Sequence, residues 1–211
     1  DRTGIVAKVS NFLATYNGWI TEASYHADQK NGWFFMRNEI KASSIPFSVE
    51  DFKTAFQPIA KEYSMNWSIS DSDTKKRVVL MVSKESHCLA DLLHRWHSKE
   101  LDAEIVAVIS NHDDLRRMVE WHDIPYHHVP VDPKDKAPAF AEVNRLVETY
   151  QTDLVVLARY MQILSAEICE QYSGRVINIH HSFLPSFAGA KPYHQAYDRG
   201  VKLIGATCHY V

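Results

Sequence analysis

The chain has 211 residues, of which 45% are hydrophobic and 23% are charged, and its formal net charge at pH 7 is −3. That length allows one large domain or two small ones, and the slightly acidic balance excludes the Lys and Arg excess that nucleic-acid binding requires. No apolar run approaches the roughly 18 residues that cross a bilayer, so the composition predicts neither a nucleic-acid partner nor a membrane partner.

Cysteine and histidine usage bears on compartment and metal content. Cys88, Cys169 and Cys208 are odd in number and far apart, without a CxxC pair, which favours a reducing, cytoplasmic compartment. The chain has twelve histidines, but pairs such as His180 and His181 lack further ligands at a recognisable zinc spacing. We therefore expect no metal and no cofactor.

The first 70 residues predict a small α+β domain. Helical spacing of apolar residues ends at Asn17-Gly18, a pair that stops helices, and Asn31-Gly32 suits a tight hairpin between two strand-like runs. We expect, in order, a helix, two strands, a second helix and a third strand, at residues 5–16, 19–27, 33–40, 49–63 and 65–69. This order is a split βαβ, or ferredoxin-like, fold without its first strand, which we expect to precede Asp1.

The segments DRTGIVAKVSNFL, NGWI and FFMRNEI of this domain resemble the ACT family of amino-acid-sensing regulatory domains. The resemblance implies pairing between subunits, hence a homo-oligomer, and binding of a small amino acid at Asp1, Gly4 and Ile5, where the first helix opens. Backbone N–H groups at a helix N-terminus suit a ligand carboxylate, and glycine permits its close approach. A purely oligomerising module is the alternative, in which Gly4 is only a turn residue.

A polar, charged linker at residues 71–76 separates this domain from a second one, at residues 77–211. Here apolar β-branched strands alternate with amphipathic helices. We expect strands at residues 77–82, 104–109, 126–129, 153–158, 175–180 and 203–210, and helices at residues 88–96, 113–121 and 138–150. The pattern predicts a doubly wound, mostly parallel, Rossmann-like α/β sheet, whose chemistry lies beyond the carboxyl ends of its strands.

Polar side chains gather at one such strand end. Because side chains alternate along a strand, Asn178, His180 and Ser182 are expected on one side of it. The Asn amide can stabilise charge on an oxygen, and a histidine with a pKa near ~6.5 can move a proton at neutral pH, which suits acyl transfer. The alternative is a buried Asn and His that satisfy backbone groups.

The segment NIHHSFLPSFAGAKPYHQAYDRGVKLIGATCHYV resembles the signature of the folate-dependent formyltransferase and formyl-hydrolase family, and ARYMQIL at residues 158–164 resembles its folate-contacting loop. The resemblance covers nearly all of residues 77–211. This resemblance and the ACT-like segment together narrow the expected family to the formyltetrahydrofolate deformylases.

The resemblance also implies roles for individual residues. Asn178 would polarise the formyl oxygen and His180 would assist proton transfer. The substrate-binding residues would be Arg159, Tyr160, Met161, Gln162 and Leu164, which hold the pterin largely through backbone groups, and Ser182, Gly189, Thr207 and His209 in the pocket. The essential carboxylate of the family follows the last strand, so we expect it just beyond Val211 and the sequence to be partial at both ends.

The loop after the first strand of the second domain distinguishes hydrolase from transferase. Glycinamide ribonucleotide formyltransferases carry a Gly-rich phosphate loop there, whereas this chain has Ser83-Lys84-Glu85-Ser86-His87. Without glycine, and with Glu85 adding negative charge, the loop is poorly suited to phosphate, although Lys84 alone weakly opposes that conclusion.

The expected reaction is therefore hydrolysis of 10-formyltetrahydrofolate to tetrahydrofolate and formate, which supplies formate for purine synthesis and balances the one-carbon folate pool. A formyltransferase acting on an amine such as glycinamide ribonucleotide, and a catalytically silent folate- or amino-acid-binding protein, are the alternatives. The expected effector of the first domain is glycine or methionine.

Overall fold

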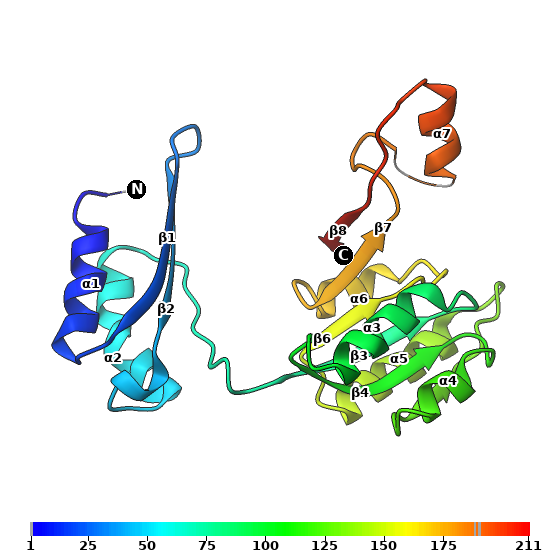
Figure 1. Cartoon of the computed structure of the whole chain (residues 1–211), viewed down its shortest axis with the longest axis horizontal. Helices are drawn as coiled ribbons and strands as arrows, with labels where there is room; N and C mark the ends of the chain where they lie inside the picture. The colour runs from blue at the N-terminus through cyan, green and yellow to red at the C-terminus, as the bar shows by residue number, and fades with distance from the viewer. Residues whose placement is uncertain (1, 188, 190) are drawn as a thin grey trace. The chain divides into compact units, whose positions relative to one another are not determined.

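The computed structural model describes residues 2–187, 189 and 191–211 (Figure 1). The chain divides into two compact units, residues 1–74 and 75–211. The division falls inside the segment that the sequence predicts as a linker. Across the described residues, no helix combines the length and apolar character needed to cross a membrane.

The first unit packs two helices on one face of a hairpin. Its elements are α1 (Ile5–Thr15), β1 (Ile20–Asp28), β2 (Trp33–Ile40), a 3₁₀ turn η1 (Ala42–Ser44) and α2 (Val49–Glu62). β1 and β2 pair antiparallel, and both helices lie on the same side of this ribbon (Figure 1). The core consists of Val9, Phe12, Leu13, Phe52, Phe56 and Ala60. Three aromatic rings therefore hold α1 against α2, with Phe12 edge-on to both Phe52 and Phe56.

The end of α1 follows from two residues. Asn17 adopts a left-handed φ of 57°, and the Gly18 N–H donates to the Leu13 carbonyl at 2.8 Å. These are the conformation and the bond that terminate helices at Asn-Gly pairs, so the predicted stop is confirmed within one residue.

The strand expected at residues 65–69 is wrong. Met65, Trp67 and Ile69 are half-buried against the core of the unit, whereas Asn66 and Ser68 are exposed, so the side chains do alternate as in a strand. However, within the described residues the sheet of this unit contains only β1 and β2. The segment lacks a strand ladder because alternation follows from packing alone, whereas a strand also requires a hydrogen-bonded neighbour.

The second unit is a doubly wound α/β fold. Its elements are β3 (Lys76–Val82), α3 (His87–His97), β4 (Ala103–Ser110), α4 (Arg116–Glu120), β5 (Tyr126–His128), α5 (Ala137–Thr149), β6 (Leu154–Leu157), α6 (Ala166–Gln171), β7 (Val176–His180), α7 (Pro192–Asp198) and β8 (Thr207–Tyr210). Within the described residues the strands form one sheet in the order β5-β4-β3-β6-β7-β8. All neighbours are parallel except β7 and β8, which pair antiparallel.

Apolar side chains cover both faces of this sheet. Alternate residues of β3 face two different clusters: Val79 and Met81 pack with α5 and α6, whereas Val78, Leu80 and Val82 pack with α3 and α4. Burying a side chain of this size contributes roughly 1.5–3 kcal/mol to folding. The predicted layer architecture is confirmed.

Two elements begin at least three residues later than predicted. The last strand begins at Thr207, because β7 ends at His180, opposite Thr207, and among the described residues no strand pairs with residues 203–206. Leu203 is accordingly 77% exposed. α4 begins only at Arg116, since a turn closed by the Arg116 N–H and the Asp113 carbonyl precedes it. The short helices α6 and α7 were not predicted, because six or seven residues show too little periodicity.

The strand order locates the crevice of the sheet. From β3 the chain moves outward to β4 and β5, then returns to β6 on the other side of β3. Such a reversal leaves an opening beyond the carboxyl ends of the two central strands. The residues that follow β3 and β6, together with the end of β7, therefore share one edge of the sheet.

Candidate active site

The end of β7 carries Asn178 and His180, the predicted catalytic pair. In register, Asn178 lies opposite His209 of β8, and His180 lies opposite Thr207. Both are half-buried. Because they are two residues apart on one strand, their side chains share the face that the sequence predicts.

His209 orients the Asn178 amide. Asn178 Nδ2 lies 3.3 Å from His209 Nε2, and His209 Nδ1 lies 2.9 Å from the Tyr210 carbonyl oxygen. A carbonyl can only accept, so Nδ1 carries the proton, and the Nε2 lone pair then accepts from the Asn178 amide. A single tautomer satisfies both bonds and leaves the second amide hydrogen of Asn178 for a ligand oxygen.

The backbone also determines the tautomer of His180. His180 Nε2 lies 3.0 Å from the Phe187 carbonyl oxygen, which also accepts from Ser182 Oγ at 2.7 Å. Nε2 must therefore donate, and the neutral ring has its lone pair at Nδ1. Nδ1 is the atom of His180 that can accept a proton.

Ser182 and Thr207, two predicted pocket residues, hold the loop after β7. Thr207 Oγ1 donates to the Ser182 carbonyl at 2.7 Å and accepts from the Leu184 N–H at 3.0 Å. Ser182 is only 3% exposed. The Thr207 hydroxyl thus holds the loop against β8, whereas the Ser182 hydroxyl is bonded within the loop. Gly189, further along, is exposed with a φ of 86°.

The predicted folate loop, residues 159–164, follows β6. Arg159 has a left-handed φ of 65°, and the next residue, Tyr160, is 7% exposed. Leu164 packs against the core, whereas Met161 is 62% exposed and Gln162 is half-buried. The loop therefore alternates between anchoring side chains and accessible ones.

Two buried polar atoms of this loop, Arg159 Nε and Tyr160 Oη, have no hydrogen-bond partner among the described residues. Buried polar atoms are normally paired with protein, water or ligand. Burial raises the pKa of Tyr160 to about 12, so the phenol stays protonated and cannot act as a base near neutral pH.

The surroundings of His181 disfavour its charged form. Burial lowers the pKa of His181, and its proximity to Arg159 and His180 lowers it further. Its ring packs between those of His180 and Tyr193. His181 therefore prefers the neutral form.

In the part of the chain that the structure describes, no group of three His, Cys, Asp or Glu side chains is placed to hold a metal.

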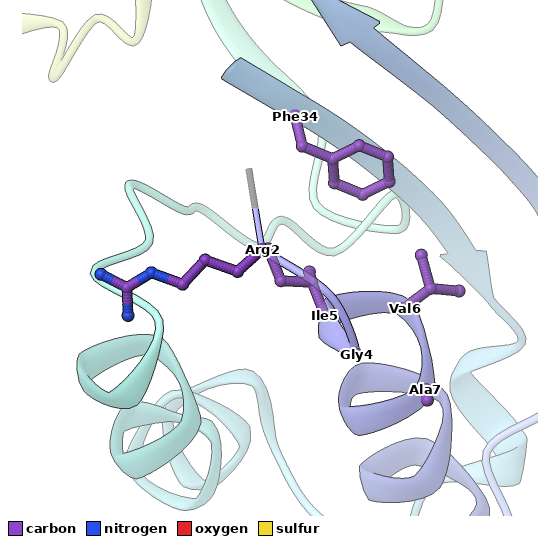
Figure 2. A pocket seen from close by; sticks show the side chains of 6 residues that line it. All are labelled: Arg2, Gly4, Ile5, Val6, Ala7 and Phe34. Atoms are coloured by element: carbon purple, nitrogen blue, oxygen red, sulfur yellow. The ribbon is translucent and has the colours of Figure 1, made fainter. Parts of the chain in front are cut away.

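A second candidate site lies in the first unit, where α1 begins (Figure 2). A cavity of about 420 Å³ is lined by Arg2, Gly4, Ile5, Val6, Ala7 and Phe34. Gly4 precedes the helix with a φ of 90°, a conformation that suits glycine. The Arg2 guanidinium points away from the cavity and donates to the Glu62 carbonyl at 3.3 Å. The lining is consequently apolar apart from the backbone N–H groups of the first helical turn.

The structure places two of the three predicted effector residues, Gly4 and Ile5, in this cavity, whereas Asp1 lies outside the described residues. Phe34 also lines the cavity and was not predicted from the sequence. Alternation along residues 33–40 puts Phe34 on the same face as Met36 and Ile40, so that signal was present.

The chain resembles known proteins over both units. A family model described as formyl transferase matches residues 76–211. A formyltetrahydrofolate deformylase from Corynebacterium sp. (strain P-1) is 45% identical over 208 residues, which cover 99% of this chain and 73% of the relative.

Solved structures show the same relationship. A formyltetrahydrofolate deformylase from Pseudomonas syringae pv. tomato is 73% identical, with a TM-score of 0.97, over 100% of this chain and 71% of that chain. Glycinamide ribonucleotide transformylase 1 from Geobacillus kaustophilus is more distant: it is 26% identical, with a TM-score of 0.61, over 65% of this chain and 75% of that chain.

Gly205 supplies the space for the Phe183 ring in the loop after β7. A Cβ atom at position 205 would lie 2.4 Å from Cε1 and 2.8 Å from Cζ of that ring. We predict that Gly205→Ala displaces the ring and lowers the melting temperature by about 2–4 °C, the shift that 1 kcal/mol produces at this size. The double variant Phe183→Ala/Gly205→Ala should melt no lower than Phe183→Ala alone. Additive losses in scanning calorimetry would contradict this explanation.

Proposed function

Since the chain belongs to the formyltetrahydrofolate deformylases of the formyl transferase family, we propose that it hydrolyses 10-formyltetrahydrofolate to tetrahydrofolate and formate. The observation that carries the proposal is the placement of Asn178 and His180 on one face of β7, at the edge where the sheet opens. The reaction would supply formate for purine synthesis and balance the one-carbon folate pool.

The proposed chemistry uses each side chain in the state that its contacts determine. His180 Nδ1 accepts a proton from water as the water oxygen bonds to the formyl carbon. The Asn178 amide donates to the formyl oxygen while negative charge develops on it. The C–N bond to the folate then breaks as His180 returns that proton to the nitrogen, and formic acid leaves and releases its remaining proton to solvent as formate. Neither a metal nor a cofactor takes part in the proposed steps.

Residues 159–164 are proposed to hold the pterin, mainly through their backbone. The two buried polar atoms of Arg159 and Tyr160 that lack partners among the described residues support a ligand here. Ser182 and Thr207 would act by holding the loop after β7, and His209 by holding the Asn178 amide. Gly189 would border the pocket.

Water is the proposed acceptor of the formyl group. The loop that joins β3 to α3 has exposed Lys84 and Glu85 side chains and no glycine, so a phosphate would meet one charge of each sign and could approach the backbone less closely. The alternative functions apply only if formate is not released. They are a transferase that uses an amine such as glycinamide ribonucleotide and a silent folate-binding protein.

The first unit is proposed to be an ACT-like regulatory domain that binds a small amino acid, glycine or methionine. Its cavity of about 420 Å³ falls within the usual range of small-molecule sites, roughly 300–1,000 Å³. The first-turn N–H groups suit the ligand carboxylate. Binding there would change turnover only if it favoured one conformation of the chain over another.

Self-association is proposed through the outer face of the hairpin. Trp33 and Phe35 are 57% and 54% exposed, and the His26 ring stacks on Phe35. A patch of this kind on a small unit is typical of protein interfaces.

The free thiols of Cys88, Cys169 and Cys208 support a reducing, cytoplasmic location.

The catalytic roles predict large losses of activity from small changes. Asn178→Ala should lower kcat/KM by about 10²–10³-fold, because the developing oxyanion loses a donor. His180→Ala should lower it by about 10²–10⁴-fold, because proton transfer loses its base. Formate release is measured without an amine and then with glycinamide ribonucleotide, beside a thermal melt.

His194→Ala is the matched control, since His194 is exposed on α7. Retained formate release with normal melts in both site variants would remove the assignment. Formyl transfer to the amine in place of release would identify a transferase, and no turnover in either assay would identify a silent binder.

The effector proposal predicts that filling the cavity abolishes regulation. Ala7→Phe places a ring where the amino acid would bind, so the rate should no longer depend on added glycine or methionine. Ala14→Phe adds the same ring two turns further along α1, at an exposed position, and should keep the response. An unaltered response in Ala7→Phe, in steady-state assays with and without each amino acid, would exclude this cavity.

The interface proposal predicts that charge on the hairpin face dissociates the assembly. Phe35→Glu should reduce the mass measured by light scattering, because a buried carboxylate is costly. Gln57→Glu, which adds the same charge at an exposed position on α2, should not. A wild-type mass equal to one chain would refute self-association outright.

A further inference from the structure

Ser83 and Asn111 join three strand ends beside the proposed folate loop. Ser83 directly follows β3 and Asn111 directly follows β4; they are 3% and 8% exposed. Ser83 Oγ donates to Asn111 Oδ1 at 2.6 Å and accepts from the Met161 N–H at 2.9 Å. One buried hydroxyl therefore connects the ends of β4 and β3 to the loop after β6.

The Asn111 end of this connection is itself held. The adjacent His112 N–H donates to Ser110 Oγ at 3.1 Å, and Tyr126 Oη donates to the His112 carbonyl at 2.6 Å. Tyr126 belongs to β5, so the bonds run from β5 through β4 and β3 to the loop after β6, in the order of the strands in the sheet. Asn111 is thus a fixed acceptor for Ser83.

The other end of this connection, at Met161, lies two residues after Arg159, the residue of the proposed folate loop with a left-handed backbone conformation. Ala158 N donates to the Met81 carbonyl at 2.8 Å just before Arg159, and Met161 N donates to Ser83 Oγ just after it. The left-handed conformation of Arg159 is uncommon for a residue other than glycine. Such conformations persist only where neighbouring contacts hold them. The end of β3 provides one such contact on each side of Arg159.

We infer that Ser83, oriented by Asn111, is a positioning residue that holds the backbone of residues 159–164 in the shape that receives the reduced folate. The inference rests on the proposed function for the identity of the ligand. Ser83 is not a nucleophile, because its proton is donated to an amide oxygen, which is not a base. Its effect on the reaction passes through the loop.

The test compares four variants of the full chain: Ser83→Ala, Ser83→Thr, Asn111→Ala and the double variant Ser83→Ala/Asn111→Ala. Ser83→Ala should raise KM for 10-formyltetrahydrofolate about tenfold, the effect of one lost hydrogen bond, with kcat changed less than about threefold. The Kd for tetrahydrofolate, measured by calorimetry, should rise by the same factor. Ser83→Thr keeps the hydroxyl and should restore both values.

The role of Asn111 predicts non-additivity. Asn111→Ala should weaken folate binding like Ser83→Ala, and the double variant should be no weaker than Ser83→Ala alone, because both act through one hydrogen bond to the loop. Asn111→Ala also carries the test if Ser83→Ala does not fold. If the losses of folate affinity in the two single variants multiply in the double variant, Asn111 does not act through Ser83 and this role is wrong.

Thr152→Val is the matched control. Thr152 is another buried hydroxyl residue, 3% exposed, but it lies before β6, at the amino end of that strand. Its Oγ1 has no hydrogen-bond partner among the described residues, so Thr152→Val should leave KM unchanged and should not lower the melting temperature. If Ser83→Ala melts lower than this control while its KM and Kd stay unchanged, Ser83 is only structural and the inference is wrong. A wild-type chain that binds tetrahydrofolate but releases no formate would refute the proposed hydrolysis alone, since the effect of Ser83→Ala on Kd would still be measurable.

Discussion

Burial of β3 on both faces is the constraint on which the second unit depends. Residues 78–82 are at most 6% exposed, with α3 and α4 packed on one side and α5 and α6 on the other. Parallel pairing with both β4 and β6 then forces three strand ends to one edge of the sheet. The polar residues Ser83, Asn111, Asn178 and His180 at that edge lie outside the clusters that hold the strands, so this apolar packing positions them.

Pairing of β7 with β8 orients the polar side chains of the candidate active site. The antiparallel register places His209 against Asn178, and the backbone carbonyls of Tyr210 and Phe187 determine which nitrogen of each histidine carries a proton. Backbone groups thus select the tautomer of each neutral histidine before any ligand enters. The amide of Asn178 presents a donor and the ring of His180 presents a lone pair, as an acyl-group hydrolysis requires.

Prediction from the sequence succeeded where a local pattern has a single cause. The apolar runs of β3 and β4 predict strands buried on both faces, and Asn17-Gly18 predicts the end of α1 because few residues tolerate that conformation. It failed at residues 65–69 and 203–206, where the strand-like pattern is real but the neighbouring strand is absent among the described residues. For Ser182 and Thr207, sequence alone does not reveal that their hydroxyls bind the chain, since the Thr207 bond joins residues 25 positions apart and the Ser182 bond depends on the fold of the loop up to Phe187. Ser83 and Asn111 are polar residues at the ends of buried strands, a signal that predicts the crevice but not their mutual bond.

The residues that follow β3 bear both on the proposed acceptor of the formyl group and on the proposed folate loop. In a loop that binds phosphate, the residues after the first strand offer free backbone N–H groups to the ligand. Here the first residue after β3 is buried, and its hydroxyl is bonded to the loop after β6. The following Lys84 and Glu85 side chains are exposed. In this chain the end of β3 thus supports the proposed folate loop, and the residues after it contain no glycine that would let a phosphate approach the backbone closely. Water therefore remains the proposed acceptor.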